Sequence, residues 1–192
     1  MLRRLYDWTM SLAAGPRARM ALGAVSFAES SIFPIPPDML LIPMVLAERT
    51  KAWTLALLCT ITSVAGGLAG YAIGALLFAQ IAEPILAFYG YLDAFETFKT
   101  HYNDWGAWAV LIAGVTPFPF KVITIASGAT GLDLAVFTIA SIIARGVRFF
   151  FVAGLLYLFG PPIRNFIEKR LGLVFTVFMV MLIAGFAAIK LL

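Results

Sequence analysis

Prolines interrupt two of the long apolar blocks of this chain, and this feature limits its fold more than any other. The first block spans residues 21–47 and the third spans residues 105–131. The interrupting residues are Pro34, Pro36, Pro37, Pro117 and Pro119. A proline inside a helix removes a backbone hydrogen bond and clashes with the preceding turn. Each block is therefore expected to divide into halves of about 10–12 residues, roughly 15–18 Å of helix. A membrane core is about 30 Å thick, so each half reaches only its midplane.

The composition places these blocks in a membrane. The 192 residues are 62% hydrophobic and 12% charged, and the mean hydropathy is +0.96. A soluble domain is about half apolar and a quarter charged. The remaining apolar blocks, which predict simple membrane spans, are residues 52–82, 134–160 and 171–192. The sequence therefore predicts an all-α integral membrane protein.

The two ends of the chain are expected to lie outside the central domain. Residues 1–19 predict an interfacial amphipathic helix, because Leu5, Trp8 and Leu12 recur at helical spacing beside arginines. We see no cleavable signal segment there. Residues 161–192 predict a basic loop followed by a C-terminal transmembrane helix. The transmembrane domain is then residues 20–160.

Two topologies fit the interrupted blocks: a broken helix that still crosses, or a re-entrant hairpin that returns to its own side. The segment 83–104 has four carboxylates and one lysine, whereas residues 48–51 and 161–170 are basic. Re-entrant hairpins place every basic cluster and the N-terminus in the cytoplasm, as the positive-inside rule favours. They make residues 83–104 an external loop. We therefore expect a multi-pass membrane protein whose N-terminus is cytoplasmic.

The two interrupted blocks also resemble each other. "PIPPD" at Pro34–Asp38 aligns with "PFPFK" at Pro117–Lys121, and Gly66 and Gly74 of the following span align with Gly146 and Gly154. Repeat one is residues 20–82 and repeat two is residues 105–160. With the topology above this is an inverted repeat of re-entrant hairpin plus transmembrane helix, which is typical of transporters with a midplane site. A match this short also arises by coincidence between apolar segments that contain prolines.

The charges inside the apolar blocks are the site candidates. Helices that restart after Pro37 and Pro119 point free N–H groups into a cavity, and Lys121 lies just beyond the second restart. Arg145 and Arg148 are three residues apart in the 134–160 block, so they share a helix face. We expect Lys121, Arg145 and Arg148 to bind a substrate phosphate. Ionisable residues within a membrane are functional candidates, and Glu29 and Asp38 are the expected proton carriers. All five proline residues are expected to shape the hairpin tips.

Structural roles explain the same charges as well. The two arginines can pair with Glu29 and Asp38 and hold the repeats together, or extend toward the membrane surface. Asp38 can cap the helix that restarts beside it. The glycine series Gly66, Gly70 and Gly74 predicts close helix packing and leaves a homodimer open.

Several other functions are not expected. One cysteine excludes an intramolecular disulfide, and one histidine makes a zinc site improbable on ligand number. No HExxH or GxSxG motif is present, so an enzyme acting on lipid phosphates is a weaker alternative. The small net charge of +4 fits anionic lipid rather than nucleic acid. We expect no cofactor and no metal.

The motifs "FAESSIFPIPPDMLLIP", "GGLAGYAIG", "ASGATG" and "LLYLFG" resemble the DedA family, also called the SNARE-associated or VTT family. The short length and "RGVRFF" look most like its YqaA-type branch. The resemblance covers about residues 20–160. It implies two re-entrant hairpins packed against spanning helices, and proton-coupled movement of an undecaprenyl phosphate or a phospholipid between leaflets. The acidic pair of the family falls on Glu29 and Asp38.

The chain departs from the family pattern at the second hairpin. The family usually carries arginines on both sides of that proline, whereas Thr116 and Lys121 stand here. This departure leaves the substrate open and shifts phosphate binding toward Arg145 and Arg148. The leading hypothesis is thus a proton-linked transporter of an anionic lipid. A membrane scaffold or assembly protein without transport is the alternative.

Overall fold

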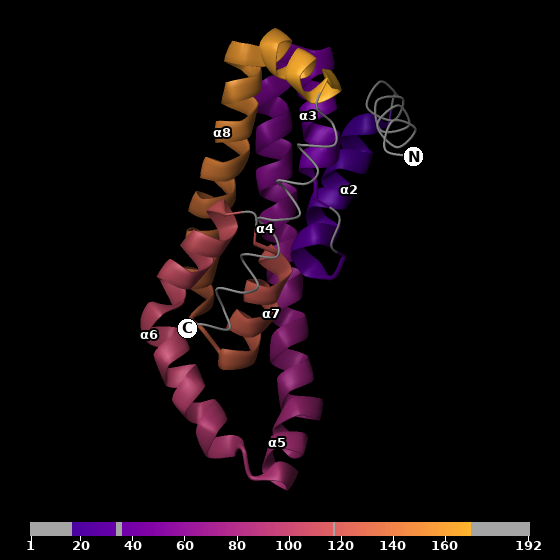
Figure 1. Ribbon diagram of the computed structural model, residues 1–192. Coiled ribbons are helices and arrows are strands. Elements are labelled where there is room, and N and C mark those ends of the chain that lie inside the picture. The colour runs from indigo at the N-terminus through magenta and orange to yellow at the C-terminus, as the bar shows by residue number, and fades with distance from the viewer. Residues whose placement is uncertain (1–16, 34–35, 117, 170–192) are drawn as a thin grey trace.

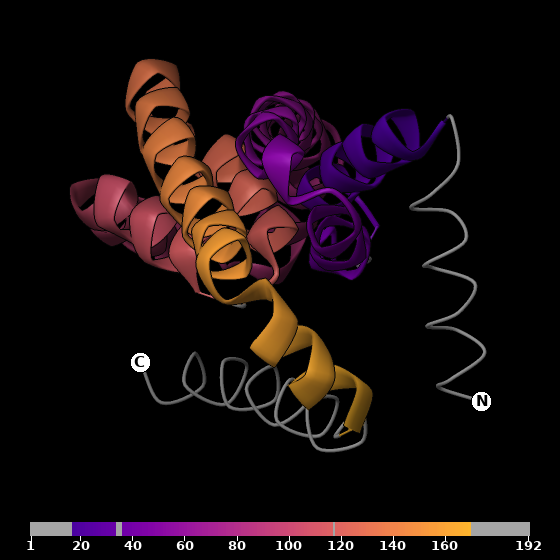
Figure 2. The same cartoon turned by 90° about the horizontal axis from the view of Figure 1, so that it is seen from above.

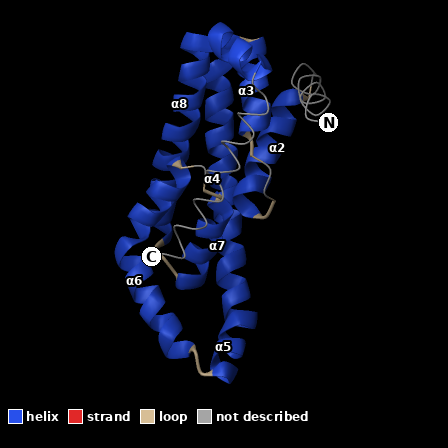
Figure 3. Cartoon of the chain, viewed as in Figure 1, coloured by secondary structure: helices blue, strands red, loops and turns tan. Residues whose placement is uncertain are grey.

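The computed structural model describes residues 17–33, 36–116 and 118–169, and these residues form helices joined by short turns (Figure 1, Figure 3). The helices are α2 (Ala18–Ser31), α3 (Asp38–Ala47), η1 (Arg49–Lys51), α4 (Ala52–Leu77), η2 (Phe78–Ala82), α5 (Glu83–Tyr89), α6 (Leu92–Val115), α7 (Phe120–Thr130) and α8 (Leu134–Lys169). The expected interfacial helix, apart from its last residues, and the expected C-terminal span lie outside the described residues. Pro34 and Pro117 also lie outside them.

Within the part of the chain that the structure describes, two stretches are long and apolar enough to cross a membrane, Arg49–Tyr89 and Leu134–Gly160. They contain the blocks predicted as simple spans at residues 52–82 and 134–160. The first stretch has 41 residues, or roughly 60 Å of helix at about 1.5 Å per residue. It therefore extends well beyond a membrane core of about 30 Å.

The prediction of a loop at residues 83–104 is wrong, because α5 and the first half of α6 occupy these residues. That the segment is external stays a prediction. A tight turn separates these helices at Gly90, whose φ of 73° lies in the left-handed region that glycine adopts without strain. The polar residues of early α6 fit a solvent-facing helix, since Lys99 pairs with Glu96 one turn away. Polarity alone had indicated a loop there.

The first hairpin consists of α2 and α3, which run in opposite directions. Gly66 lies against Phe27 and Gly70 against Ser30, so α2 runs in the same direction as α4. Asp38 lies beside Arg148, and the chain just after α3 meets Gly160, so α3 runs along α8. The spans α4 and α8 are themselves antiparallel (Figure 1).

The second hairpin consists of α6 and α7, which enter from the other end of the bundle. Gly70 of α4 meets Thr124 and Gly74 meets Ile125, so α7 follows α4. Gly114 of α6 lies against Ala144, so α6 follows α8. The expected 10–12 residues per half hold for α3 and α7, but α6 has 24 residues.

The turns of the two hairpins meet midway along the bundle. Pro37 immediately precedes α3 and Pro119 immediately precedes α7, where a proline lacks only an N–H that the helix does not use. The Lys121 ammonium donates to the Ile32 carbonyl at 3.1 Å, and the Thr124 hydroxyl donates to the Ser30 carbonyl at 3.0 Å. Side chains of the second hairpin thus hold backbone carbonyls of the first.

Glycines let both hairpins lie directly on the backbone of α4. A Cβ at Gly66 would lie 2.1 Å from the Phe27 carbonyl oxygen, and one at Gly74 would lie 2.0 Å from that of Ile125. No side chain fits at such distances. The glycine series expected to pack helices therefore does so within this chain. Gly66, the first of the series, contacts α2, and Gly74, the last, contacts α7.

Two apolar clusters enclose the meeting point of the hairpins. One joins α3, α4 and α8 with the start of α2 around Leu41, Cys59 and Phe149. The other joins α6, α7 and α8 around Phe120 and Phe137. Buried polar residues lie between the clusters, so the charges occupy the middle of the bundle. They are Ser26, Glu29, Ser30, Ser63, Thr124, Ser141 and Arg145.

Helical backbone continues through Lys169, so the expected basic loop at residues 161–170 is wrong. A break at Phe159, with φ −116° and ψ 21°, changes the direction of α8 (Figure 2). Pro161 and Pro162 have no N–H and free the carbonyls of Tyr157 and Leu158, four residues earlier. The Arg49 guanidinium donates to both carbonyls and so replaces the missing donors.

Candidate functional site

A buried ion pair joins the first hairpin to the second span. Nη2 of Arg145 on α8 lies 2.8 Å from Oε2 of Glu29 on α2. The side chains are 0% and 11% exposed, respectively. A charge removed from water at this depth is tolerated when it is paired and its other polar atoms find partners. Burial of the Glu29 carboxylate therefore requires Arg145, and burial of the Arg145 guanidinium requires Glu29.

Two serines close a ring of hydrogen bonds around this pair. Arg145 Nε donates to Ser63 Oγ at 2.6 Å, and the Ser63 hydroxyl lies 2.6 Å from that of Ser30. The Ser30 hydroxyl also donates to Glu29 Oε2 at 3.2 Å. The ring thus runs from arginine through two hydroxyls to the carboxylate and directly back.

Aromatic rings hold the Arg145 guanidinium on its remaining sides. Its Cζ lies 4.9 Å from the ring centre of Phe120 on α7 and 4.6 Å from that of Phe149 on α8. A cation over an aromatic face is attracted by the ring quadrupole, the more so when it is desolvated. Arg145 is therefore held by side chains from α2, α4, α7 and its own helix.

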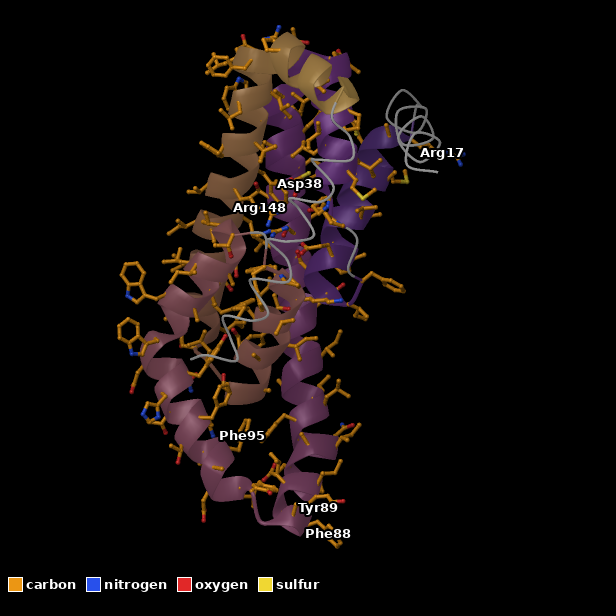
Figure 4. The ribbon with its side chains drawn as sticks, viewed as in Figure 1. Arg17, Asp38, Phe88, Tyr89, Phe95 and Arg148 are labelled. Atoms are coloured by element: carbon orange, nitrogen blue, oxygen red, sulfur yellow. The ribbon has the colours of Figure 1, made fainter. Side chains whose placement is uncertain are left out.

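A second ion pair lies about one turn further along α8. Nη2 of Arg148 lies 2.6 Å from Oδ2 of Asp38, the first residue of α3 (Figure 4). Nη1 of Arg148 donates to the carbonyl of Thr116, at the end of α6, at 2.7 Å. Arg148 therefore connects the turns of both hairpins. The side chains are 13% and 19% exposed, so this pair is more accessible than the first.

Three buried polar atoms in this region have no hydrogen-bond partner among the described residues. They are Arg145 Nη1, Asp38 Oδ1 and Ser141 Oγ. Each ion pair thus leaves hydrogen-bonding capacity unused, and such capacity is uncommon in a protein interior.

The charged residues predicted from the sequence fall into two groups in the structure. Glu29, Asp38, Arg145 and Arg148 come together as two carboxylate–arginine pairs, which was one of the roles that the sequence left open. Asp38 does not cap α3, since its side chain makes no capping bond. Lys121 lies at the tip of the second hairpin and bonds to a carbonyl of the first.

Sequence reasoning missed Ser30, Ser63, Phe120 and Phe149. A serine within a long apolar helix is a weak signal. Ser30 and Ser63 each lie three residues from the close contact between Phe27 and Gly66. Among the described residues, no three His, Cys, Asp or Glu side chains lie close enough to hold a metal ion.

One comparison with known proteins identifies a family. A model of the VTT domain matches residues 35–158. An uncharacterized protein of Haemophilus influenzae is 36% identical over 151 residues, which cover 79% of this chain and 78% of that protein. An uncharacterized homolog from Histophilus somni is 35% identical over the same length. No solved structure matches the chain. With the matched domain covering more than half of its length, the chain belongs to the VTT domain family, the DedA family of membrane proteins.

Proposed function

We propose that this protein moves an anionic lipid, a polyprenyl phosphate or a phospholipid, between the two leaflets of a bacterial inner membrane and couples that movement to protons. The observation that carries the proposal is the meeting of two oppositely directed hairpin turns at two carboxylate–arginine pairs. The proposal takes the hairpins as re-entrant, the two repeats as inverted and the N-terminus as cytoplasmic.

The directions of the helices support this arrangement. In order along the chain, α2, α3 and α4 run down, up and down, whereas α6, α7 and α8 run up, down and up (Figure 1). Two units of opposite direction around a central site are typical of alternating-access transporters. Irregular backbone at membrane depth is tolerated only where protein or water covers it, as the two turns require.

The charges support an anionic substrate. Arg145, Arg148 and Lys121 supply positive charge where the turns meet, and arginine forms paired hydrogen bonds with phosphate. Glu29 and Asp38 compete for the arginines in the absence of substrate. Protonation of a carboxylate weakens its hold on an arginine, so proton binding and phosphate binding favour each other.

Leaflet exchange in proteoliposomes tests the proposal. The purified protein is reconstituted with a fluorescent phospholipid or a labelled polyprenyl phosphate, with and without an imposed proton gradient. We expect movement that depends on the gradient and is lost in Asp38→Asn, with empty liposomes as the baseline. Absence of movement of either lipid by well-folded protein would refute the proposal.

A membrane scaffold without transport is the second candidate. The completeness of the two ion pairs favours it, because paired charges can serve only to join the hairpins. In that case Glu29→Gln and Lys121→Ala lower the amount of folded protein in the membrane. In a transporter, Lys121→Ala lowers the rate of lipid movement while the protein remains abundant. Measuring membrane abundance beside activity separates the two.

A further inference from the structure

The two ion pairs differ in how firmly they are held, and this difference carries a further inference that rests on the proposed function. We propose that Arg148–Asp38 is an exchangeable pair, in which a phosphate group replaces the Asp38 carboxylate on Arg148 when Asp38 takes up a proton. The Arg145–Glu29 pair stays closed throughout.

The Arg145–Glu29 pair is too enclosed to exchange. Its arginine makes a direct bond to the carboxylate and a second to Ser63, and it lies between two phenylalanine rings. Opening it would expose a bare guanidinium and a bare carboxylate to the apolar clusters on either side. A phosphate arriving from outside meets no exposed part of Arg145.

The Arg148–Asp38 pair has the opposite properties. Both side chains are partly exposed, and a single hydrogen bond joins them. The second oxygen of Asp38 has no partner among residues 17–33, 36–116 and 118–169, so a proton added there displaces no bond that these residues make. The Thr116 carbonyl holds the other nitrogen of Arg148 and keeps the guanidinium in place when Asp38 releases it.

Lys121 supplies the second positive charge of the expected anion site. Its ammonium has three N–H donors, and the Ile32 carbonyl takes one of them. Arg148 and Lys121 each hold a carbonyl where the two hairpin turns meet. The expected ligand is a phosphate group, carried by a lipid or free in solution.

The exchange conserves charge and breaks no covalent bond between heavy atoms. A proton from the solution adds to Asp38, and the neutral acid releases Arg148. A phosphate oxygen then accepts the hydrogen bond that Arg148 had donated to Asp38. One proton therefore accompanies each singly charged phosphate. The other charged or titratable groups near Asp38 are Arg145 on α8 and Cys59 on α4. Glu29 on α2 is paired, and Lys121 on α7 bonds to a carbonyl.

Calorimetry of ligand binding tests this exchange without relying on transport. The full-length protein in nanodiscs of zwitterionic lipid is titrated near neutral pH with short-chain phosphatidylglycerol, and separately with its free head group, glycerophosphoglycerol. Both ligands are phosphodiesters, which do not titrate in this range. Two buffers of different ionisation enthalpy give the number of protons taken up per ligand. For the wild type we expect about one proton.

The variants decide which pair exchanges. Asp38→Asn is expected to bind the phosphodiester about 5- to 150-fold more tightly than the wild type, with no proton uptake. Glu29→Gln is expected to keep the uptake of the wild type. If that variant does not fold, Ser63→Ala, which removes a bond of the same ring, replaces it. If Asp38→Asn does not fold, Asp38→Ser serves in its place.

Other results would overturn the inference. Proton uptake that persists without the Asp38 carboxyl, or that vanishes in Glu29→Gln, assigns the exchange to another group. No binding of either ligand at millimolar concentration also contradicts it.

Binding of the free head group with equal proton uptake means that the phosphate itself is recognised, whereas binding of the lipid alone means that the site also requires the acyl chains. If proton-linked binding holds but lipids do not move in proteoliposomes, the exchange stands and the transport function is wrong.

Discussion

The contact between Gly74 of α4 and the backbone of α7 gives a sharp prediction about stability. In Gly74→Ala the new Cβ would lie 2.0 Å from the Ile125 carbonyl oxygen, and 2.8 Å from its carbonyl carbon. Both are backbone atoms, so no side-chain rotation relieves the contact. The two helices must separate by about 1.5 Å before the methyl group reaches an ordinary contact distance of about 3.5 Å.

The size of the effect follows from two opposing terms. Forcing an extra methyl group into a packed interior costs about 1–3 kcal/mol, and more where backbone must move. Replacing glycine by alanine within a helix raises the free energy of unfolding by roughly 1 kcal/mol. We therefore expect Gly74→Ala to lower the free energy of unfolding by about 1–2 kcal/mol, toward the upper end because only backbone can yield.

Gly146→Ala is the matched control. Gly146 lies inside α8, in the other span, and the nearest atom to its added Cβ is 3.9 Å away. Only the helix term applies there, so we expect this variant to be as stable as the wild type or slightly more stable. Thermal unfolding in detergent, followed by tryptophan fluorescence, measures both. Equal midpoints for Gly74→Ala and Gly146→Ala would refute the reasoning that α4 needs glycine to seat the second hairpin.

Three further predictions concern other contacts. Arg145→Met alone leaves the Glu29 carboxylate buried without a partner and should destabilise the fold by about 3–5 kcal/mol. Adding Glu29→Gln should restore most of this in thermal unfolding; a double variant no more stable than the single would contradict the pairing. Gly131→Ala forces a side chain into a φ of 66°. It should cost about 1–2 kcal/mol in the same assay although no atom lies near, and an unchanged midpoint would speak against it. Arg49→Met removes the donor to the two freed carbonyls of α8 and should cost about 1–3 kcal/mol. Lys51→Met, whose ammonium pairs only with Glu48, should cost under about 1 kcal/mol.

The turns of the hairpins were predictable because proline acts locally. Pro37 and Pro119 each stand immediately before a helix, a position that suits proline because the N–H it lacks has no partner within the helix. The helix that replaces the expected loop at residues 83–104 was not predictable from polarity. Its carboxylates, which indicated water-facing residues correctly, are compatible with helix and with loop alike. Helical spacing within the segment, as between Glu96 and Lys99, was the signal to weigh.

The members of the site were predictable, but their partners were not. An ionisable residue in an apolar block stands out in any sequence, which is how Asp38 and Arg148 were found. Their pairing depends on how two hairpins approach along α4, and that approach is set by backbone contacts at glycines. Ser63 is one small polar residue among many in apolar helices. Only the position of Arg145 shows that the Ser63 hydroxyl accepts a hydrogen bond from the guanidinium.

The ion pairs also set an order of events during synthesis. Glu29 and Arg145 are 116 residues apart, and Asp38 and Arg148 are 110 residues apart. At about 5–20 residues per second, the first hairpin exists for roughly 6–20 seconds before either arginine has been made. During that interval both of its carboxylates lack their partners, so neither ion pair can form until this part of α8 has left the ribosome. A nascent chain that stalls before α8 therefore lacks both arginine partners of its first hairpin.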